Sequence, residues 1–238
     1  MGSASVLYVQ NSLVLNIDQE IERQSLLKHP FYQLWTRGEL DINHLQGYSK
    51  EYFQLVKSIP RLVGNIIFNS SVSDSTYYAN RAFTTLLISS MQEESDHIEP
   101  WMDFASSLGT PRTELLKFQG SDETNRAIEM IGNLTKQSVS RGAAAMYAYE
   151  KELPKISNTK IEGLQKYYGL ADKKSLNYFE IHREIDIKHA AIWREALESI
   201  DSNIEQEQTF AAARTSLKCL NTILDEVYQK YVGVLPSY

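Results

Sequence analysis

Two histidines and an aspartate lie close together in the segment of residues 182–189. His182, Asp186 and His189 follow one another at steps of four and three residues. Because an α-helix turns about 100° per residue, these steps bring all three side chains to one helix face. Two imidazoles and a carboxylate are ligand types that bind first-row transition metals. The spacing therefore predicts a metal-binding helix here.

A second segment, residues 93–97, carries two glutamates before a histidine. Glu93 lies four residues before His97 and Glu94 lies three before it, so either carboxylate shares a helix face with the imidazole. The Glu-x-x-His spacing is typical of helical bundles that hold two metal ions. We take Glu93 as the predicted ligand and keep Glu94 as the alternative. A solvent-exposed acidic face with an incidental histidine explains this segment equally well.

A third candidate, Glu150, ends the apolar run of residues 143–149. A buried carboxylate must be paired or must coordinate a metal, and a salt bridge to Lys151 or Lys155 is the structural alternative. Three carboxylates and three imidazoles are enough to hold two divalent ions with open positions for dioxygen. Iron or manganese suits such ligands. The predicted metal ligands are Glu93, His97, Glu150, His182, Asp186 and His189.

The elements that position these residues are predicted to be helices. Glycine (11) and proline (6) are sparse, so long segments pass without a helix breaker, and no segment alternates as a strand does. We expect an all-α bundle of about seven to nine helices in one domain, residues 17–238, after a flexible segment, residues 1–16. The expected helices span residues 18–23, a segment opening at Pro30, 42–69 with a kink at Pro60, 76–107 with a bend at Pro100, 121–138, 143–152 with an end distorted by Pro154, 160–168, 174–199 and 203–232.

The composition excludes several classes of protein. The formal net charge is −6, and without a lysine or arginine run this argues against nucleic-acid binding. No apolar run is long enough to cross a bilayer, and the N-terminus lacks the pattern of a secretory signal. Cys219 is the only cysteine, which excludes an internal disulfide and fits a reducing cytoplasm, where we expect this protein.

Several of these motifs, in one order, resemble a known family. The chain is similar to the haem-oxygenase-like dimetal oxygenases, and within them to the group around the chlamydial "protein associating with death domains". It resembles pyrroloquinoline-quinone synthase and the TenA thiaminases more distantly. The likeness covers about residues 25–200 and is carried by His29-Pro30-Phe31-Tyr32, Trp35, Gly38-Glu39-Leu40, the segment 46–52, Ile59-Pro60, Glu93-Glu94, His97-Ile98, Trp101, the segment 147–150, Leu153-Pro154, the segment 160–164 and the segment 182–190.

The resemblance implies a haem-oxygenase-like bundle without haem, and a self-sacrificing synthesis of 4-aminobenzoate, the folate precursor. It places the ring donor at Tyr32, the amino donor at Lys160, and a further redox-active tyrosine at Tyr149. It implies two metal ions, either Fe/Fe or Mn/Fe, with dioxygen and an external reductant as cosubstrates. By the same analogy the protein forms a homodimer.

One departure from the family concerns the first ligand pair. In the family the glutamate and histidine lie about two helical turns apart, whereas Glu93 and His97 are one turn apart. Both spacings return to one helix face, so a ligand pair survives the shortening. Two other functions stay open: a dimetal oxygenase, N-oxygenase or desaturase acting on an external small molecule, and a non-enzymatic protein that binds death-domain-type partners.

Overall fold

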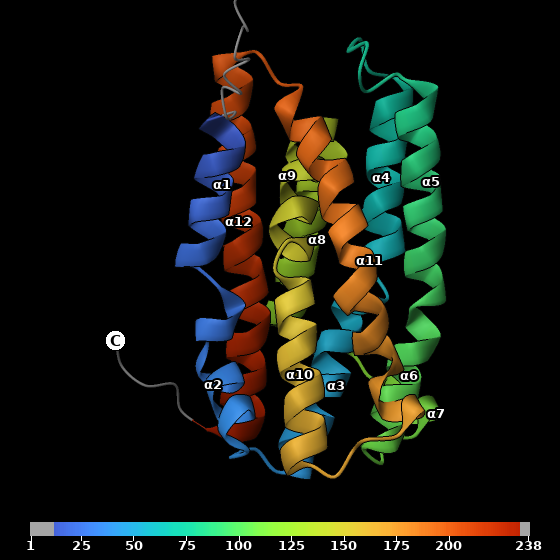
Figure 1. Ribbon diagram of the computed structural model, residues 1–238, viewed down its shortest axis with the longest axis vertical. Coiled ribbons are helices and arrows are strands. Elements are labelled where there is room, and N and C mark those ends of the chain that lie inside the picture. Colours follow the sequence, from blue (N-terminus) through green and yellow to red (C-terminus); the bar gives the residue numbers. More distant parts are fainter. Residues whose placement is uncertain (1–11, 234–238) are drawn as a thin grey trace, which may run out of the picture.

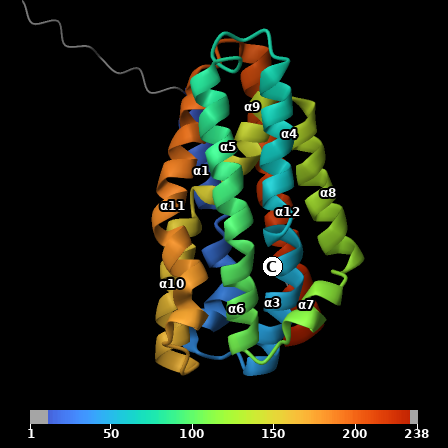
Figure 2. The ribbon, with the colours of Figure 1, turned by 90° about the vertical axis from the view of Figure 1, so that its right-hand side faces the viewer.

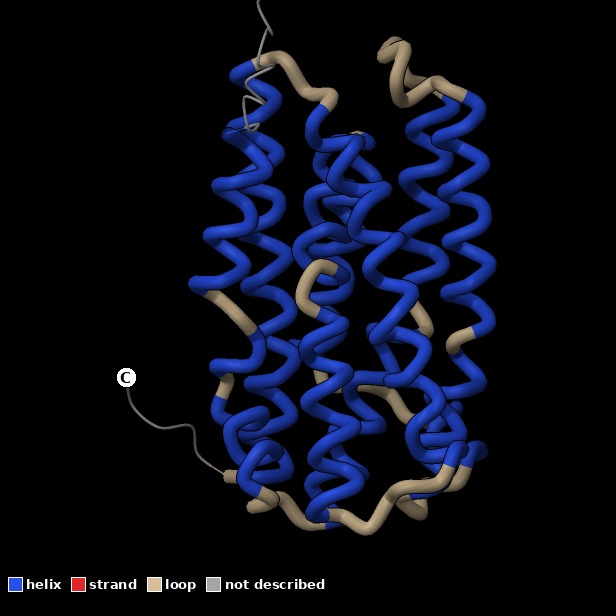
Figure 3. Tube along the Cα trace, in the orientation of Figure 1, coloured by secondary structure: helices blue, strands red, loops and turns tan. Residues whose placement is uncertain are grey.

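The computed structural model describes residues 12–233, and every regular element in this range is a helix (Figure 1, Figure 3). The predicted all-α fold is therefore confirmed. The α-helices are α1 (Ser12–Arg23), α2 (Pro30–Arg37), α3 (Ile42–Val56), α4 (Ile59–Ser71), α5 (Arg81–Asp96), α6 (Ile98–Ser107), α7 (Arg112–Lys117), α8 (Asp122–Gln137), α9 (Val139–Glu150), α10 (Leu153–Tyr167), α11 (Lys173–Glu198) and α12 (Asn203–Val227), with a 3-10 turn at Leu26–Lys28 and a π-helical turn at Tyr228–Val232.

Several helices lie end to end along the long axis of the bundle. The views in Figure 1 and Figure 2 show α3 continuing into α4, α5 into α6, and α9 into α10. The longer helices α11 and α12 run alongside these pairs and pack against α9. Within residues 12–233, no helix combines the length and the hydrophobicity that crossing a membrane requires.

Besides Pro30, three prolines lie in the first turns of helices, which corrects three of the predicted boundaries. The expected helix 42–69 is two helices, because Pro60 lies in the first turn of α4. The expected helix 76–107 begins at Arg81 and is interrupted at His97, three residues before Pro100. Pro154 opens α10 instead of distorting the end of α9. The reason is that proline lacks an N–H and is tolerated only in a first turn, where that donor has no intrahelical partner.

The first helix begins earlier than the sequence predicts. Residues 12–16 were expected to be flexible, but α1 starts at Ser12, and the prediction for residues 1–11 lies outside the described range. The apolar stripe of α1 is buried against α9, α11 and α12, which stabilises these residues as helix. The buried members of the stripe are Leu13, Val14, Ile17 and Ile21.

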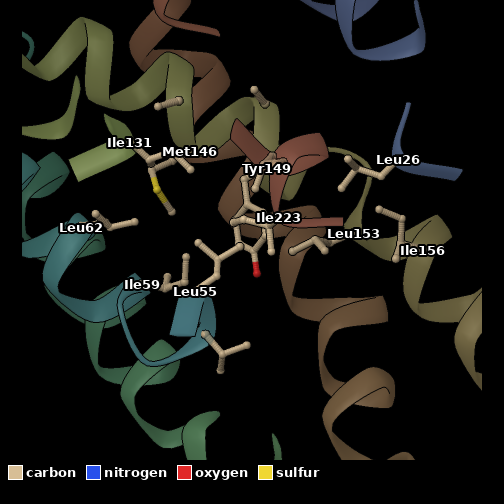
Figure 4. Close-up of a cluster of buried hydrophobic side chains, with 14 of the residues drawn as sticks. Leu26, Leu55, Ile59, Leu62, Ile131, Met146, Tyr149, Leu153, Ile156 and Ile223 are labelled. Atoms are coloured by element: carbon tan, nitrogen blue, oxygen red, sulfur yellow. The ribbon is translucent and has the colours of Figure 1, made fainter. Parts of the chain in front are cut away.

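Helix α9 lies in the middle of the bundle and is buried along nearly its whole length. Its small residues let neighbouring helices approach closely: a Cβ on Gly142 would lie 2.6 Å from the Ile66 side chain. Figure 4 shows Met146 and Tyr149 among buried side chains from α3, α4, α8, α10 and α12. This central position explains why Glu150, at the end of α9, is removed from solvent.

Candidate metal centre

One face of α11 directs three polar side chains into the bundle. His182, Asp186 and His189 are all buried, as their helical spacing predicts. The backbone carbonyl of Tyr178 lies 2.8 Å from Nδ1 of His182. If Nδ1 donates this hydrogen bond, Nε2 of His182 is left as the free lone pair that points into the site.

Glu94 of α5 lies at the centre of this group. Its Oε1 is 3.2 Å from Nδ1 of His189, and its Oε2 is 3.8 Å from Nε2 of His182 and 3.6 Å from Nδ1 of His97. The two oxygens of one carboxylate therefore face two different sets of nitrogen atoms. This is the placement that a carboxylate shared between two metal ions requires.

The two glutamates left as alternatives by the sequence occupy different places. The Glu94 side chain is 6% exposed and faces the histidines, whereas the Glu93 side chain is 41% exposed. Oε2 of Glu93 lies 2.8 Å from Nε2 of His189, on the side of the ring that faces away from Glu94. Glu93 therefore contacts the site through His189, while Glu94 lies inside it.

The remaining predicted ligand, Glu150, approaches from α9. Its Oε2 accepts a hydrogen bond of 2.6 Å from the indole N–H of Trp193, one turn after His189 on α11. Its pKa is raised well above the usual range, first by burial and then, with an opposing effect of His189, by the charges of Asp186 and Glu94. Glu150 thus lies near enough to the cluster to sense its charge.

The donor atoms form two buried triads that share one residue. In each triad the facing atoms lie within 4.8 Å of one another; the first is Glu94, His97 and His182, and the second is Glu94, Asp186 and His189. Among the described residues, four of these buried atoms have no hydrogen-bond partner: Nδ1 of His97, Nδ1 of His189 and both Asp186 oxygens. Buried polar atoms are normally satisfied, so a donor set with unpaired lone pairs fits a pair of cations.

Without a bound cation, the charged carboxylate of Glu94 and the protonated ring of His189 stabilise each other. Burial would raise the pKa of Glu94, but the nearby imidazoles of His182, His189 and His97 hold it well below its usual range. Burial also disfavours protonated His189, yet the nearby carboxylates of Asp186 and Glu94 raise its pKa to about 12. A proton on a ligand nitrogen must leave before a metal binds there, so metal binding and proton release are coupled.

A second cluster, built from aromatic rings around a lysine, adjoins the donor set. Nζ of Lys160 lies between 5.0 and 5.9 Å from the centroids of five rings, and the side chain is almost fully buried. We call this set the aromatic cage; its rings belong to Tyr32, Tyr48, Tyr52, Trp101 and Phe179. Two predicted catalytic residues, Tyr32 and Lys160, are therefore neighbours, at 5.5 Å from Nζ to the ring centroid.

The surroundings of the cage favour the neutral forms of the Lys160 amine and the Tyr32 phenol. Burial lowers the pKa of Lys160 to about 7. Burial, followed by the charge of Tyr52, raises the pKa of Tyr32 well above its usual range. At neutral pH a large share of the Lys160 amine thus carries a free lone pair beside an un-ionised phenol, whose oxygen lies 3.4 Å from that of Tyr48.

The third predicted catalytic residue, Tyr149, interacts electrostatically with both clusters. Its pKa is raised well above the usual range, first by burial and then by Tyr52, Tyr178, Glu94 and Asp186. Tyr52 belongs to the aromatic cage, and the two carboxylates belong to the donor set. The structure brings all nine predicted site residues into one region of the bundle, with Glu93 at its outer edge.

Two neighbours of the donor set were not singled out by the sequence. The ring of Tyr178 stacks on His182, with centroids 4.0 Å apart, and Trp193 donates to Glu150. Tyr178 lies four residues before His182, and Trp193 lies four after His189. Extending the helical spacing by one turn in each direction finds both, since residues four apart share a helix face.

Fold and donor set together define a class: an all-helical protein with a buried carboxylate and imidazole centre suited to redox metals. Residues 46–221 match the family described as "Iron-containing redox enzyme", so the chain belongs to that family. The resemblance inferred from the sequence is thereby confirmed at the level of the family.

Individual relatives agree with this assignment. A protein of Nitrosomonas europaea named "4-aminobenzoate synthase" is 30% identical, with 94% of each chain covered. A protein of Chlamydia trachomatis with the same name is 33% identical, over 73% of this chain and 74% of its own length. A solved domain of unknown function with a heme oxygenase-like fold, from Shewanella denitrificans, has a TM-score of 0.77 at 19% identity, covering 95% of this chain and 97% of that one.

Proposed function

We propose that this protein makes 4-aminobenzoate from its own side chains in a metal- and dioxygen-dependent reaction. Tyr32 supplies the ring and Lys160 supplies the amino group. The observation that carries this proposal is the contact between the two: the Lys160 amine lies 5.5 Å from the Tyr32 ring centroid, inside a cage that adjoins the donor set. The names of relatives at about 30% identity support the product.

The donor set is suited to hold two ions. One would be held by Glu94, His97 and His182 and the other by Glu94, Asp186 and His189, with the buried Glu150 as a further predicted ligand. Bound iron, or manganese with iron, would supply the capacity to activate dioxygen. Glu93 fixes the orientation of His189 through its outer nitrogen, as carboxylates behind metal-binding histidines do.

The residues of the cage prepare the two donor side chains. The rings around Lys160 exclude water and keep much of its amine uncharged at neutral pH, which a nitrogen that forms a new bond requires. The Tyr32 hydroxyl lies 3.4 Å from that of Tyr48, so its proton has a neighbouring oxygen to move to. Tyr149 interacts electrostatically with Tyr52 of the cage and with Glu94 and Asp186 of the donor set, which makes it the candidate to relay a proton between them.

Isotope labelling tests the origin of the product. Protein made with ring-labelled tyrosine and amine-labelled lysine is loaded with Fe(II), or Mn(II) and Fe(II), and given oxygen and reductant. The product should carry both labels and should not exceed one molecule per chain. Tyr32→Phe and Lys160→Met should abolish it, whereas Tyr77→Phe, at the other end of the bundle, should not.

A different result would select another function. Unlabelled product formed repeatedly from a supplied small molecule would contradict self-sacrifice and favour an oxygenase with an external substrate. Metal analysis of the same samples separates this outcome from a failure of metal binding. A chain that binds no metal at all would overturn the proposed oxygen chemistry altogether.

A further inference from the structure

A continuous series of aromatic rings leads away from the donor set. Tyr178 stacks on His182 and contacts Trp101, with centroids 4.7 Å apart. Trp101 stacks on Tyr52 at 5.5 Å, and Tyr52 lies 5.2 Å from Tyr48. These rings come from α3, α6 and α11. Except for His182, all of them are tyrosine or tryptophan, the aromatic side chains that lose an electron most readily.

The series continues from Tyr48 to the surface of the protein. The ring of Trp35 lies 5.8 Å from Tyr48, and Tyr168 lies 5.8 Å from Trp35 on its other side. Tyr167 follows at 6.4 Å from Tyr168 and is 41% exposed. We call Trp35, Tyr168 and Tyr167 the outer branch. It connects solvent to a donor set whose inner ligands are all buried.

Glycines make room for two of the rings in the outer branch. A Cβ on Gly163 would lie 2.4 Å from Nε1 of Trp35, and a Cβ on Gly38 would lie 2.5 Å from the Tyr167 ring. Any other residue at either position would displace these rings. The two ring positions are therefore built into the contact between α2 and α10.

The identity of Trp35 is not explained by packing alone. Its indole N–H is buried and meets no hydrogen-bond acceptor in the described part of the chain. An unpaired buried donor carries a cost that phenylalanine would avoid. A tryptophan retained at that cost is consistent with a role that needs the indole ring itself.

We propose that the outer branch carries single electrons between a reductant at the surface and the aromatic rings beside the metal centre. This proposal rests on the proposed function, which consumes electrons from outside the protein. A reductant cannot touch the inner ligands, because they are buried. Rings in near contact offer a continuous route for electrons through the intervening protein.

Each step moves one electron from one ring to the next and leaves every bond to carbon unchanged. A one-electron reductant in solvent is oxidised at Tyr167, and the electron vacancy that was on Tyr178 is filled. A tyrosine that loses its electron also releases its phenolic proton, Tyr167 to solvent and Tyr48 to the Tyr32 oxygen 3.4 Å away, and it recovers both when the next residue reduces it. Tyr52 and Tyr168 have buried hydroxyls that meet no acceptor in the described part of the chain, so they keep their protons and only bridge the rings on either side. The tryptophans can carry the vacancy with their N–H retained, as Trp101 does while donating to the Ser49 carbonyl at 2.9 Å.

A photosensitiser at the outer end tests this route. Cys219 is buried, so Lys166→Cys offers a selective attachment point beside Tyr167 for a ruthenium polypyridyl label. The full-length, metal-loaded protein is kept anaerobic, and a flash with an oxidative quencher withdraws one electron through the label. We expect a transient tryptophan radical and fast re-reduction of the label.

Removing the redox function of one ring should interrupt the route. Trp35→Phe removes the redox-active indole and Tyr168→Leu removes the bridging ring. Each change, made in the labelled protein, should lower the tryptophan radical yield several-fold and slow re-reduction. Tyr77→Phe is the matched control and should leave both unchanged. Equal radical yield and equal re-reduction in the labelled parent and in both branch variants would overturn the proposal. Because no product is measured, this outcome is independent of whether 4-aminobenzoate is formed.

Discussion

The carboxylate of Glu93 lies 2.8 Å from Nε2 of His189, while Nδ1 of the same ring lies 3.2 Å from Glu94. His189 therefore separates the two adjacent glutamates, one outside and one inside the donor set. Under the proposed function this arrangement gives them different roles: Glu94 as a shared ligand and Glu93 as the residue that orients His189.

Metal binding by two matched variants distinguishes these roles. Glu94→Gln should lose at least one of the two ions, because it removes the oxygen charge that faces both sets of nitrogens. Glu93→Gln keeps a hydrogen-bonding group beside His189 and should weaken metal affinity by at most about 10–100-fold, as loss of an orienting partner does. Metal content after dialysis, with binding titrations, measures both. Loss of metal in Glu93→Gln with retention in Glu94→Gln would reverse the assignment.

Metal loading at neutral pH should release protons. His189 has a pKa of about 12 in the metal-free protein, so at pH 7 it is protonated and must lose its proton to bind a metal through Nδ1. Apparent affinity should therefore increase with pH. Proton release into a weakly buffered solution, followed with an indicator dye, measures the effect. Affinity that is independent of pH between 6 and 8 would argue that His189 is not a ligand.

Lys160 should lower the stability of the folded protein below pH 10. Its pKa is about 7 when folded, against the usual lysine value of 10.5, so between these values the unfolded chain binds more protons and stability rises with pH. Lys160→Met removes the charge that is costly to bury and should stabilise the protein by a few kcal/mol at pH 7. Urea unfolding from pH 6 to 10 should show this advantage shrinking as pH rises. An advantage that does not change with pH would contradict the assigned cause.

Two glycines in neighbouring helices should respond oppositely to alanine. A Cβ on Gly142 would meet Ile66 at 2.6 Å and the Thr135 backbone at 3.3 Å, so Gly142→Ala should destabilise the protein by about 1–3 kcal/mol. At Gly64 the nearest atom would be Sδ of Met91 at 3.6 Å, an ordinary contact. Gly64→Ala should therefore stabilise α4 by about 0.5–1 kcal/mol. Thermal unfolding measures both, and a stabilising Gly142→Ala would show that the centre of the bundle is less tightly packed.

Local spacing in the sequence was sufficient to predict the fold class and one helix face that carries buried imidazole and carboxylate groups. His182, Asp186 and His189 share a face because helix periodicity alone sets their relative directions. The same reasoning predicted a buried Glu150, since an apolar helix that ends in a carboxylate carries it into the core. The family resemblance added Tyr32 and Lys160, which composition and spacing did not distinguish from other tyrosines and lysines.

Tertiary packing decided the contacts between residues on different helices. Whether Glu93 or Glu94 points inward depends on how α5 is rotated against α11, and both glutamates satisfy the spacing to His97 equally. The rings around Lys160 come from α2, α3, α6 and α11, which no local pattern relates. Periodicity fixes directions within one helix, whereas the contacts between helices follow from how all side chains fill the shared core.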